Sequence, residues 1–127
     1  MYTVSVSHEF TAWHYLIGGD WGPENELNAH PYKVEALVEG PGLDRHGYLV
    51  DIIAVEQAMA AIDTRYAGKT LNELPEFEGL NPSVEHFARI LWDFIVERIP
   101  TEPLAYMTIR VWEGDDAWAS YRREIRR

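Results

Sequence analysis

The sequence predicts an α+β domain in which a four-stranded antiparallel sheet carries two helices on one face. Four segments alternate apolar and polar residues with the period of two that is typical of half-buried strands. Between the second and the third of them, two segments repeat apolar residues at helical spacing. The chain has 127 residues, 46% of them hydrophobic, which is enough for one core but too short for two domains. We therefore expect one domain over residues 1–127, in the order strand, strand, helix, helix, strand, strand.

The first two strands are expected at residues 3–12 and 30–39. In each, successive side chains point to opposite faces, so that one face is apolar and the other polar. Turn-forming residues at 18–23 and 40–42 bound these segments. The expected apolar face consists of Val4, Val6, His8, Phe10, Tyr32, Val34, Ala36 and Val38.

Cap signals place the two helices. Asp51 is a helix cap or a first-turn acid, and the apolar repeat behind it runs to about Tyr66. Asn81 is expected to cap the second helix, with Pro82 at its first helical position. Pro100 stops that helix, because proline cannot donate the backbone hydrogen bond that a helix requires.

Two further strands are expected at residues 104–113 and 116–125, joined by the turn signal Gly114-Asp115-Asp116. A sheet of four strands has open edges, which proteins cover by closure or by pairing with a neighbour. The sequence therefore favours self-association through the sheet.

Composition limits the classes of partner. With 21 Asp and Glu against 11 Lys and Arg, the chain has a formal net charge of −10, so it should repel nucleic acids and anionic membranes. The absence of cysteine excludes disulfides, thiolate metal sites and a thiol nucleophile. The N-terminal residues lack the features of a secretory signal, and no apolar run approaches the ~20 residues that span a bilayer. We expect a soluble cytoplasmic protein.

Two of the five histidines, His14 and His30, lie at ends of expected strands. Antiparallel pairing of these strands brings both imidazoles to the same end of the sheet. Two neutral imidazoles there suit Zn²⁺, which also needs a third protein ligand and an open position for catalysis. Two histidines do not define a metal site, and from spacing alone a structural role is the commoner interpretation.

Three carboxylates are further candidates. Glu24 lies in the loop between the two histidines and suits a general base, a metal ligand or an ordinary exposed acid. Asp63 is near the end of the first helix, where its role is equally open. Glu113 closes an apolar stripe on the third strand, a position that suits anchoring a ligand or reaching solvent.

Motifs spread over nearly the whole chain resemble, in the same order, those of the 6-pyruvoyl-tetrahydropterin synthase and 6-carboxy-tetrahydropterin synthase family. Residues 10–14, Phe-Thr-Ala-Trp-His, resemble the family's Phe-x-Ala-Ala-His, whose histidine is the first zinc ligand. Residues 28–34 resemble its His-Gly-His-x-Tyr-x-Val, which supplies the other two ligands. Further similar segments are Gly47–Asp51, Ile62–Thr64, Leu71–Asn72, Asn81–Glu85 and Trp112–Glu113.

The resemblance implies a tunnelling fold that assembles into trimers and hexamers, with active sites between subunits. It also implies a Zn²⁺ ion at the positions of His14, Asn28 and His30, and a small-molecule pterin substrate whose ring Glu113 holds. The usual substrate of the family is 7,8-dihydroneopterin triphosphate.

Three departures from the family pattern fall on the chemistry. Asn28 replaces a zinc histidine, which lowers the expected affinity for zinc because an amide is a poorer ligand. Glu24 occupies the position of the catalytic cysteine, and family members with this exchange are associated with cleaving dihydroneopterin-type side chains to 6-hydroxymethyl-dihydropterin. Thr64 replaces a proton-moving histidine and cannot titrate near neutral pH.

These observations favour a pterin-handling lyase acting on 7,8-dihydroneopterin or its triphosphate, with Glu24 and Asp63 as catalytic residues. Two alternatives stay open. One is a catalytically silent homologue that binds a pterin or purine or serves as an oligomeric scaffold. The other is metal-free chemistry in the same pocket.

Overall fold

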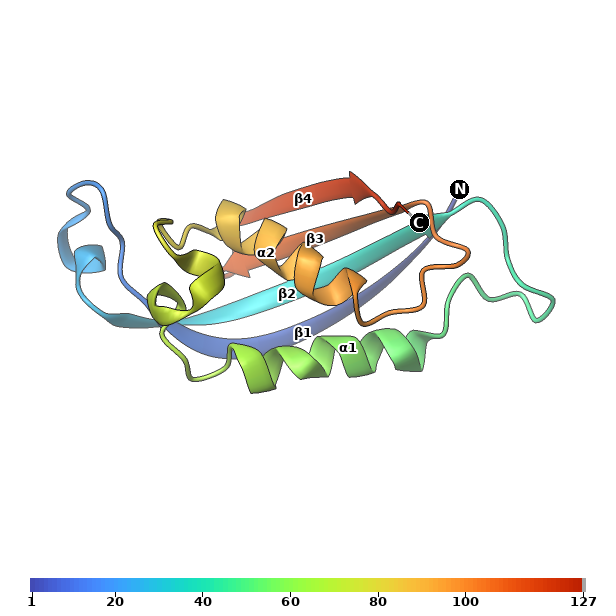
Figure 1. The fold of residues 1–127 in the computed structure, drawn as a ribbon, viewed down its shortest axis with the longest axis horizontal. Coiled ribbons are helices and arrows are strands. Elements are labelled where there is room, and N and C mark those ends of the chain that lie inside the picture. The colour runs from blue at the N-terminus through green and yellow to red at the C-terminus, as the bar shows by residue number, and fades with distance from the viewer. Residues whose placement is uncertain (127) are drawn as a thin grey trace.

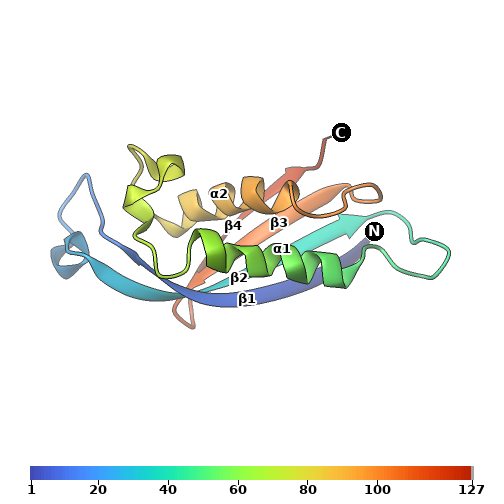
Figure 2. The ribbon, with the colours of Figure 1, turned by 60° about the horizontal axis from the view of Figure 1, so that its bottom comes forward.

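The computed structural model describes residues 1–126 and confirms the predicted fold class and element order. All neighbouring strands are antiparallel, in the spatial order β1-β2-β3-β4. Both helices lie on one face of this sheet (Figures 1 and 2). The elements are β1 (Tyr2–His14), β2 (Asn28–Gly40), α1 (Ile52–Arg65), α2 (Val84–Val96), β3 (Tyr106–Glu113) and β4 (Trp118–Glu124).

The first two strands are longer than the sequence pattern predicted, and this extension matters for the site. β1 continues two residues beyond position 12 and β2 begins two residues before position 30. The pairing runs without interruption from Tyr2 opposite Gly40 to His14 opposite Asn28. His14 and His30 therefore belong to the rigid ladder rather than to the loop that joins the strands.

The core lies between the sheet and the two helices. α1 packs on β1, whereas α2 packs across β3 and β4. Nearly all of the expected apolar face is at least half-buried, and the exposed fraction is 0% for each of Val34, Ala36 and Val38. Inside the core the Trp92 indole donates a hydrogen bond to the Met107 carbonyl at 2.7 Å, which ties α2 to β3.

The helix caps agree with the sequence at one helix and differ at the other. The Asp51 carboxylate accepts a hydrogen bond from the Ile53 amide at 3.0 Å, so the predicted cap of α1 is confirmed. The prediction that Asn81 caps α2 is wrong, because Ser83 caps it and accepts from the His86 amide at 3.2 Å. The Asn81 side chain instead accepts a hydrogen bond from the Ile17 amide, in the segment after β1. Within the described residues, no helix is long and apolar enough to cross a membrane.

Candidate active site

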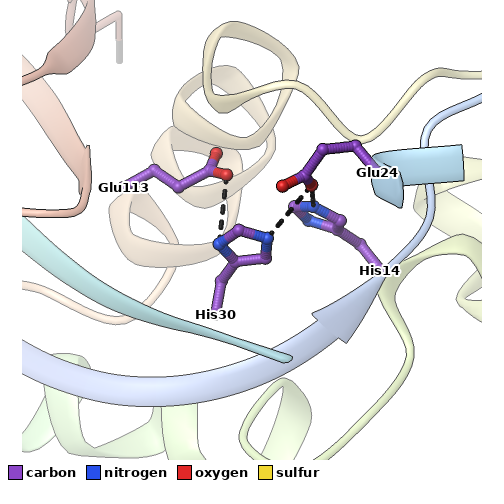
Figure 3. A group of neighbouring side chains, drawn as sticks. All are labelled: His14, Glu24, His30 and Glu113. Carbon is purple, nitrogen blue, oxygen red and sulfur yellow. Dashed lines mark hydrogen bonds and ion pairs between the residues drawn. The ribbon is translucent and has the colours of Figure 1, made fainter. Parts of the chain in front are cut away.

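Four titratable side chains meet at one end of the sheet (Figure 3). His14 ends β1, His30 lies near the start of β2 and Glu113 ends β3. Glu24 lies in a short 3-10 helix, Gly22–Asn25, within the loop between β1 and β2. Each residue offers one ligand atom, and these four atoms all lie within 4.8 Å of one another.

The strand register accounts for this meeting. His14 lies directly opposite Asn28, and His30 follows two residues later on the same face of the sheet. In the next ladder Tyr32 lies opposite Glu113, which brings that carboxylate beside His30. Three of the four side chains are thus placed by backbone hydrogen bonds of the sheet, and only Glu24 depends on a loop.

The Nε2 atoms of both histidines face the Glu24 carboxylate. Glu24 Oε2 lies 3.3 Å from Nε2 of His30 and 3.7 Å from Nε2 of His14. The two imidazole rings are stacked, with 4.4 Å between their centroids and 27° between their planes. The arrangement directs two ring nitrogens and one carboxylate oxygen toward a common point.

The Nδ1 atoms of the same rings are occupied by other partners. His14 Nδ1 lies 2.7 Å from the Tyr32 hydroxyl, and His30 Nδ1 lies 3.2 Å from Glu113 Oε1. Hydrogen bonds of this kind fix the orientation of an imidazole and select its tautomer. With each Nδ1 occupied in this way, Nε2 is the ring nitrogen that each histidine directs at Glu24.

The environment of His14 favours its neutral form. Only 1% of this residue is exposed. Burial lowers the pKa of the His14 imidazole, and His30 lowers it further, while Glu24 opposes both. His14 Nε2 is buried and makes no hydrogen bond within the described part of the chain. A neutral imidazole with a buried, unsatisfied nitrogen is suited to a metal ion.

Two acidic groups beside the histidines, the Glu113 carboxyl and the Tyr32 hydroxyl, have raised pKa values. Burial raises the pKa of the Glu113 carboxyl, His30 opposes this, and Glu24 and Glu85 add to it. Burial likewise raises the pKa of the Tyr32 hydroxyl, with contributions from Glu113 and Glu24. Tyr32 is therefore a protonated phenol at every physiological pH.

The residues present fit a zinc ion. Two histidines and one glutamate form a set of three protein ligands that is known for catalytic zinc, with the fourth position left to water or substrate. Ligand atoms about 2.0–2.1 Å from a tetrahedral zinc lie about 3.4 Å from one another. The two distances from Glu24 Oε2, 3.3 and 3.7 Å, are close to that separation.

Asn28 makes contacts of a different kind. Its amide nitrogen donates to the His14 carbonyl at 3.2 Å and to the Glu26 carbonyl at 2.7 Å. The first of these bonds joins the start of β2 to the end of β1, and the second fixes the loop residue that precedes β2. The expectation that Asn28 is a zinc ligand stays a prediction, and Glu24 offers the third ligand in its place.

Asp63 is separate from the four-residue group. It lies in the last turn of α1, where Oδ1 is 2.8 Å from Nε2 of His8. His8 precedes His14 by six residues of β1, which corresponds to about 20 Å along an extended strand. Within one chain, Asp63 and Glu24 do not share a site.

Sequence reasoning placed Tyr32 on the apolar face and did not identify its role beside His14. A signal for it was present, since a tyrosine in a buried strand needs a partner for its hydroxyl. Because the sequence also predicted a histidine at the same end of the sheet, that histidine was a candidate for the partner.

Comparison with known proteins gives one family match for the chain. The family model of 6-pyruvoyl tetrahydropterin synthase matches residues 3–124. No curated protein matches the chain by sequence.

Solved structures share the fold at low sequence identity. The 6-pyruvoyl tetrahydropterin synthase of Caenorhabditis elegans is 17% identical with a TM-score of 0.82, over 96% of this chain and 95% of that one. A Plasmodium vivax 6-pyruvoyltetrahydropterin synthase, in which a glutamate described as a catalytic residue is changed to alanine, is 16% identical with a TM-score of 0.75, over 98% and 100%. A Vibrio cholerae protein described as a putative dihydroneopterin aldolase is 15% identical with a TM-score of 0.59, over 98% of both chains.

Proposed function

The chain belongs to the 6-pyruvoyl tetrahydropterin synthase family, and from that premise we propose that it is a pterin-handling lyase in which Glu24 moves the proton. Its proposed substrate is 7,8-dihydroneopterin or its triphosphate. The observation that carries the proposal is the convergence of both Nε2 atoms on the Glu24 carboxylate. The P. vivax synthase described above supports it, because a glutamate is a catalytic residue there.

His14, His30 and the Oε2 atom of Glu24 would hold the zinc ion, which would leave the Oε1 atom of Glu24 to exchange the proton. When bound, zinc supplies a Lewis acid that polarises the oxygen atoms of the substrate side chain. The residues of the chain provide the rest of the chemistry. Tyr32 and Glu113 contact the Nδ1 atoms of the two imidazoles and so orient both Nε2 atoms toward Glu24. The side chain of Glu113 is 31% exposed, so the ring of a substrate can reach the carboxylate.

Glu24 is the proposed acid–base group. Its side chain is 44% exposed and thus accessible from solvent. In the proposed cleavage it takes the proton of the second side-chain hydroxyl, and the bond between the first and second side-chain carbons breaks. The second carbon leaves as an aldehyde, and the electron pair is delocalised into the pterin ring. Protonated Glu24 then returns the proton to the first carbon, giving 6-hydroxymethyl-dihydropterin.

The test is turnover by protein purified without added metal, combined with elemental analysis. We expect about one zinc per chain and formation of 6-hydroxymethyl-dihydropterin from dihydroneopterin. Glu24→Gln should lower kcat by about 10²–10⁴-fold, as loss of a general acid–base group does. If dihydroneopterin and its triphosphate both stay unchanged, the lyase proposal is wrong and the silent homologue is favoured.

Asp63 retains its proposed catalytic role only if copies of the chain associate. Since it lies far from Glu24 along β1, it would serve the site of a neighbouring copy, with His8 as its hydrogen-bonded imidazole partner. We propose a trimer or hexamer on this basis. The outer edges of β4 and of β1 before Thr11 offer backbone groups through which sheets extend, whereas Thr11 and Trp13 already bond to Gly68 and Lys69.

A further inference from the structure

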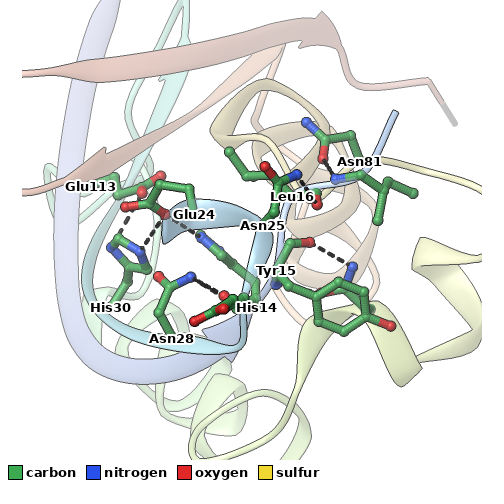
Figure 4. Close-up of polar contacts among 12 residues, drawn as sticks. His14, Tyr15, Leu16, Glu24, Asn25, Asn28, His30, Asn81 and Glu113 are labelled. Atoms are coloured by element: carbon green, nitrogen blue, oxygen red, sulfur yellow. Dashed lines mark hydrogen bonds and ion pairs between the residues drawn. The ribbon is translucent and has the colours of Figure 1, made fainter. Parts of the chain in front are cut away.

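The segment that follows β1 is held by two asparagine side chains from distant parts of the chain. The Tyr15 amide donates to Asn72 Oδ1 at 3.0 Å, and Asn72 Nδ2 donates to the Tyr15 carbonyl at 2.9 Å. Two residues on, the Ile17 amide donates to Asn81 Oδ1 at 2.8 Å. Figure 4 labels Tyr15 and Asn81, which lie beside the site residues. Asn72 lies in the 3-10 helix Leu71–Glu73, and Asn81 precedes α2.

Leu16, which lies between Tyr15 and Ile17, bonds to the loop that carries Glu24 rather than to the body of the domain. Its amide donates to the Glu24 carbonyl at 2.8 Å, and its carbonyl accepts from Asn25 Nδ2 at 3.0 Å. Asn25 also donates to the Gly19 carbonyl at 3.0 Å and accepts from the Trp21 amide at 2.7 Å. The backbone of Glu24 is therefore attached to Leu16, and the residues on either side of Leu16 are attached to the body of the domain.

We propose that Asn72 and Asn81 are positioning residues that hold the Glu24 carboxylate at the two Nε2 atoms. The proposal rests on the proposed function, in which Glu24 moves the proton. The other three site residues are fixed by the sheet, whereas Glu24 depends on the loop. The backbone bonds of residues 15–17 connect that loop to the domain, and the two asparagines supply three of them.

The two asparagines differ in what they must provide. Asn72 donates one hydrogen bond and accepts one, which is what a peptide group of a neighbouring strand would do. Within the described residues, the Asn81 side chain accepts from the Ile17 amide and makes no other hydrogen bond. A carboxylate can replace the acceptor but cannot donate, so aspartate is tolerable at 81 and unsuitable at 72, where it would face the Tyr15 carbonyl.

This difference defines the experiment. The variants are Asn72→Asp, Asn72→Leu, Asn81→Asp and Asn81→Leu, with Glu73→Gln on the same 3-10 helix as the control, because Glu73 is exposed. Hydrogen–deuterium exchange of residues 15–27 reports the attachment of the loop without any ligand. We expect exchange there to rise at least tenfold in Asn72→Asp, Asn72→Leu and Asn81→Leu. Asn81→Asp should keep the protection of the wild-type loop, and exchange in β2 should not change in any variant.

Steady-state kinetics and zinc affinity supply the second readout. In the three impaired variants, kcat should fall about 10–100-fold with KM within twofold, and zinc affinity measured by chelator competition should fall in parallel. Unchanged loop exchange, or a uniform rise in β2 as well, would overturn the positioning role. If Asn72→Leu does not fold, the comparison of Asn81→Leu with Asn81→Asp decides. If the wild-type chain turns over neither substrate, the proposed function fails while exchange still tests the attachment.

Discussion

At the scale of single residues, the site is defined by which nitrogen of each histidine is occupied. Tyr32 holds Nδ1 of His14 and Glu113 holds Nδ1 of His30. The two partners differ in kind, one a neutral phenol and the other a titratable carboxyl. Both leave Nε2 directed at Glu24, and this shared outcome makes the pair suitable for a metal.

Tyr32→Phe tests this tautomer selection. The change removes one hydroxyl from a buried position and leaves the ring in place, so the strand and core should persist. We expect zinc affinity to fall about tenfold, because His14 loses the group that orients it. Chelator competition against wild type measures this, and equal affinities would show that Tyr32 does not orient His14.

Metal-free protein should lose stability as the pH falls. The pKa of His14 is lowered in the folded state, so below the usual value of about 6.5 the unfolded chain binds a proton that the folded chain does not. The loss of stability begins near pH 6.5 and is complete below the lowered pKa of His14 in the folded state. Glu113, whose pKa is raised, acts in the opposite sense at lower pH, since protonation then favours the folded state.

The measurement is urea unfolding of chelator-treated protein from pH 7.5 to pH 5. In His14→Phe, the dependence of the unfolding free energy on pH should be flatter across the upper part of that range, whatever its absolute value. An identical slope in the variant and wild type would contradict the assignment to His14.

At the scale of elements, the helices are delimited by side chains that bond to their free amides. Ser83 performs this for α2, because its hydroxyl accepts from the His86 amide. Asn81, two residues earlier, fastens the loop that carries Glu24 instead. Two polar residues that are two positions apart thus serve separately the stability of the helix and the placement of the site.

Ser83→Ala should lower the unfolding free energy by about 1 kcal/mol, the usual cost of losing an N-cap. Urea denaturation measures the loss, and Ser83→Asp, which keeps an acceptor, should recover most of it. If Ser83→Ala also increased exchange at residues 15–27, the separation between helix cap and loop anchor would be refuted.

The sequence was sufficient for the elements and for the meeting of two histidines. Alternation and helical spacing located the four strands and the two α-helices but none of the three described 3-10 helices, and antiparallel pairing then required His14 and His30 to lie together. The anchors of the loop were not predictable, since Asn72 and Tyr15 are 57 positions apart and no local pattern encodes their contact. Asn81 was misplaced for a related reason, because asparagine suits a cap and a loop anchor equally well.

At the scale of the whole molecule, the sheet has one face covered by helices and two open edges. The chain carries a net charge of −10, which disfavours anionic partners but does not prevent pairing of edges through backbone groups. The proposed association includes a contribution of Asp63 from one copy to the Glu24 site of another.

Mixing two impaired variants tests that arrangement. Glu24→Gln and Asp63→Asn should each be almost inactive alone, yet chains co-expressed in equal amounts with different tags should regain about a quarter of wild-type activity when they assemble at random. With random assembly, about one site in four contains both a native Glu24 and a native Asp63. No recovery in confirmed mixed oligomers would show that Asp63 does not complete a neighbour's site.

The ladder between β1 and β2 also determines which relatives can carry the same chemistry. His14 faces the helices because an even number of positions separates it from Phe10 and Ala12, which are buried. Losing one residue from that stretch would invert the parity and direct the imidazole to the opposite face. The loop, in contrast, can change in length between its anchored ends. Relatives with this site are therefore best recognised by odd or even spacing within the strand, even where their loops differ.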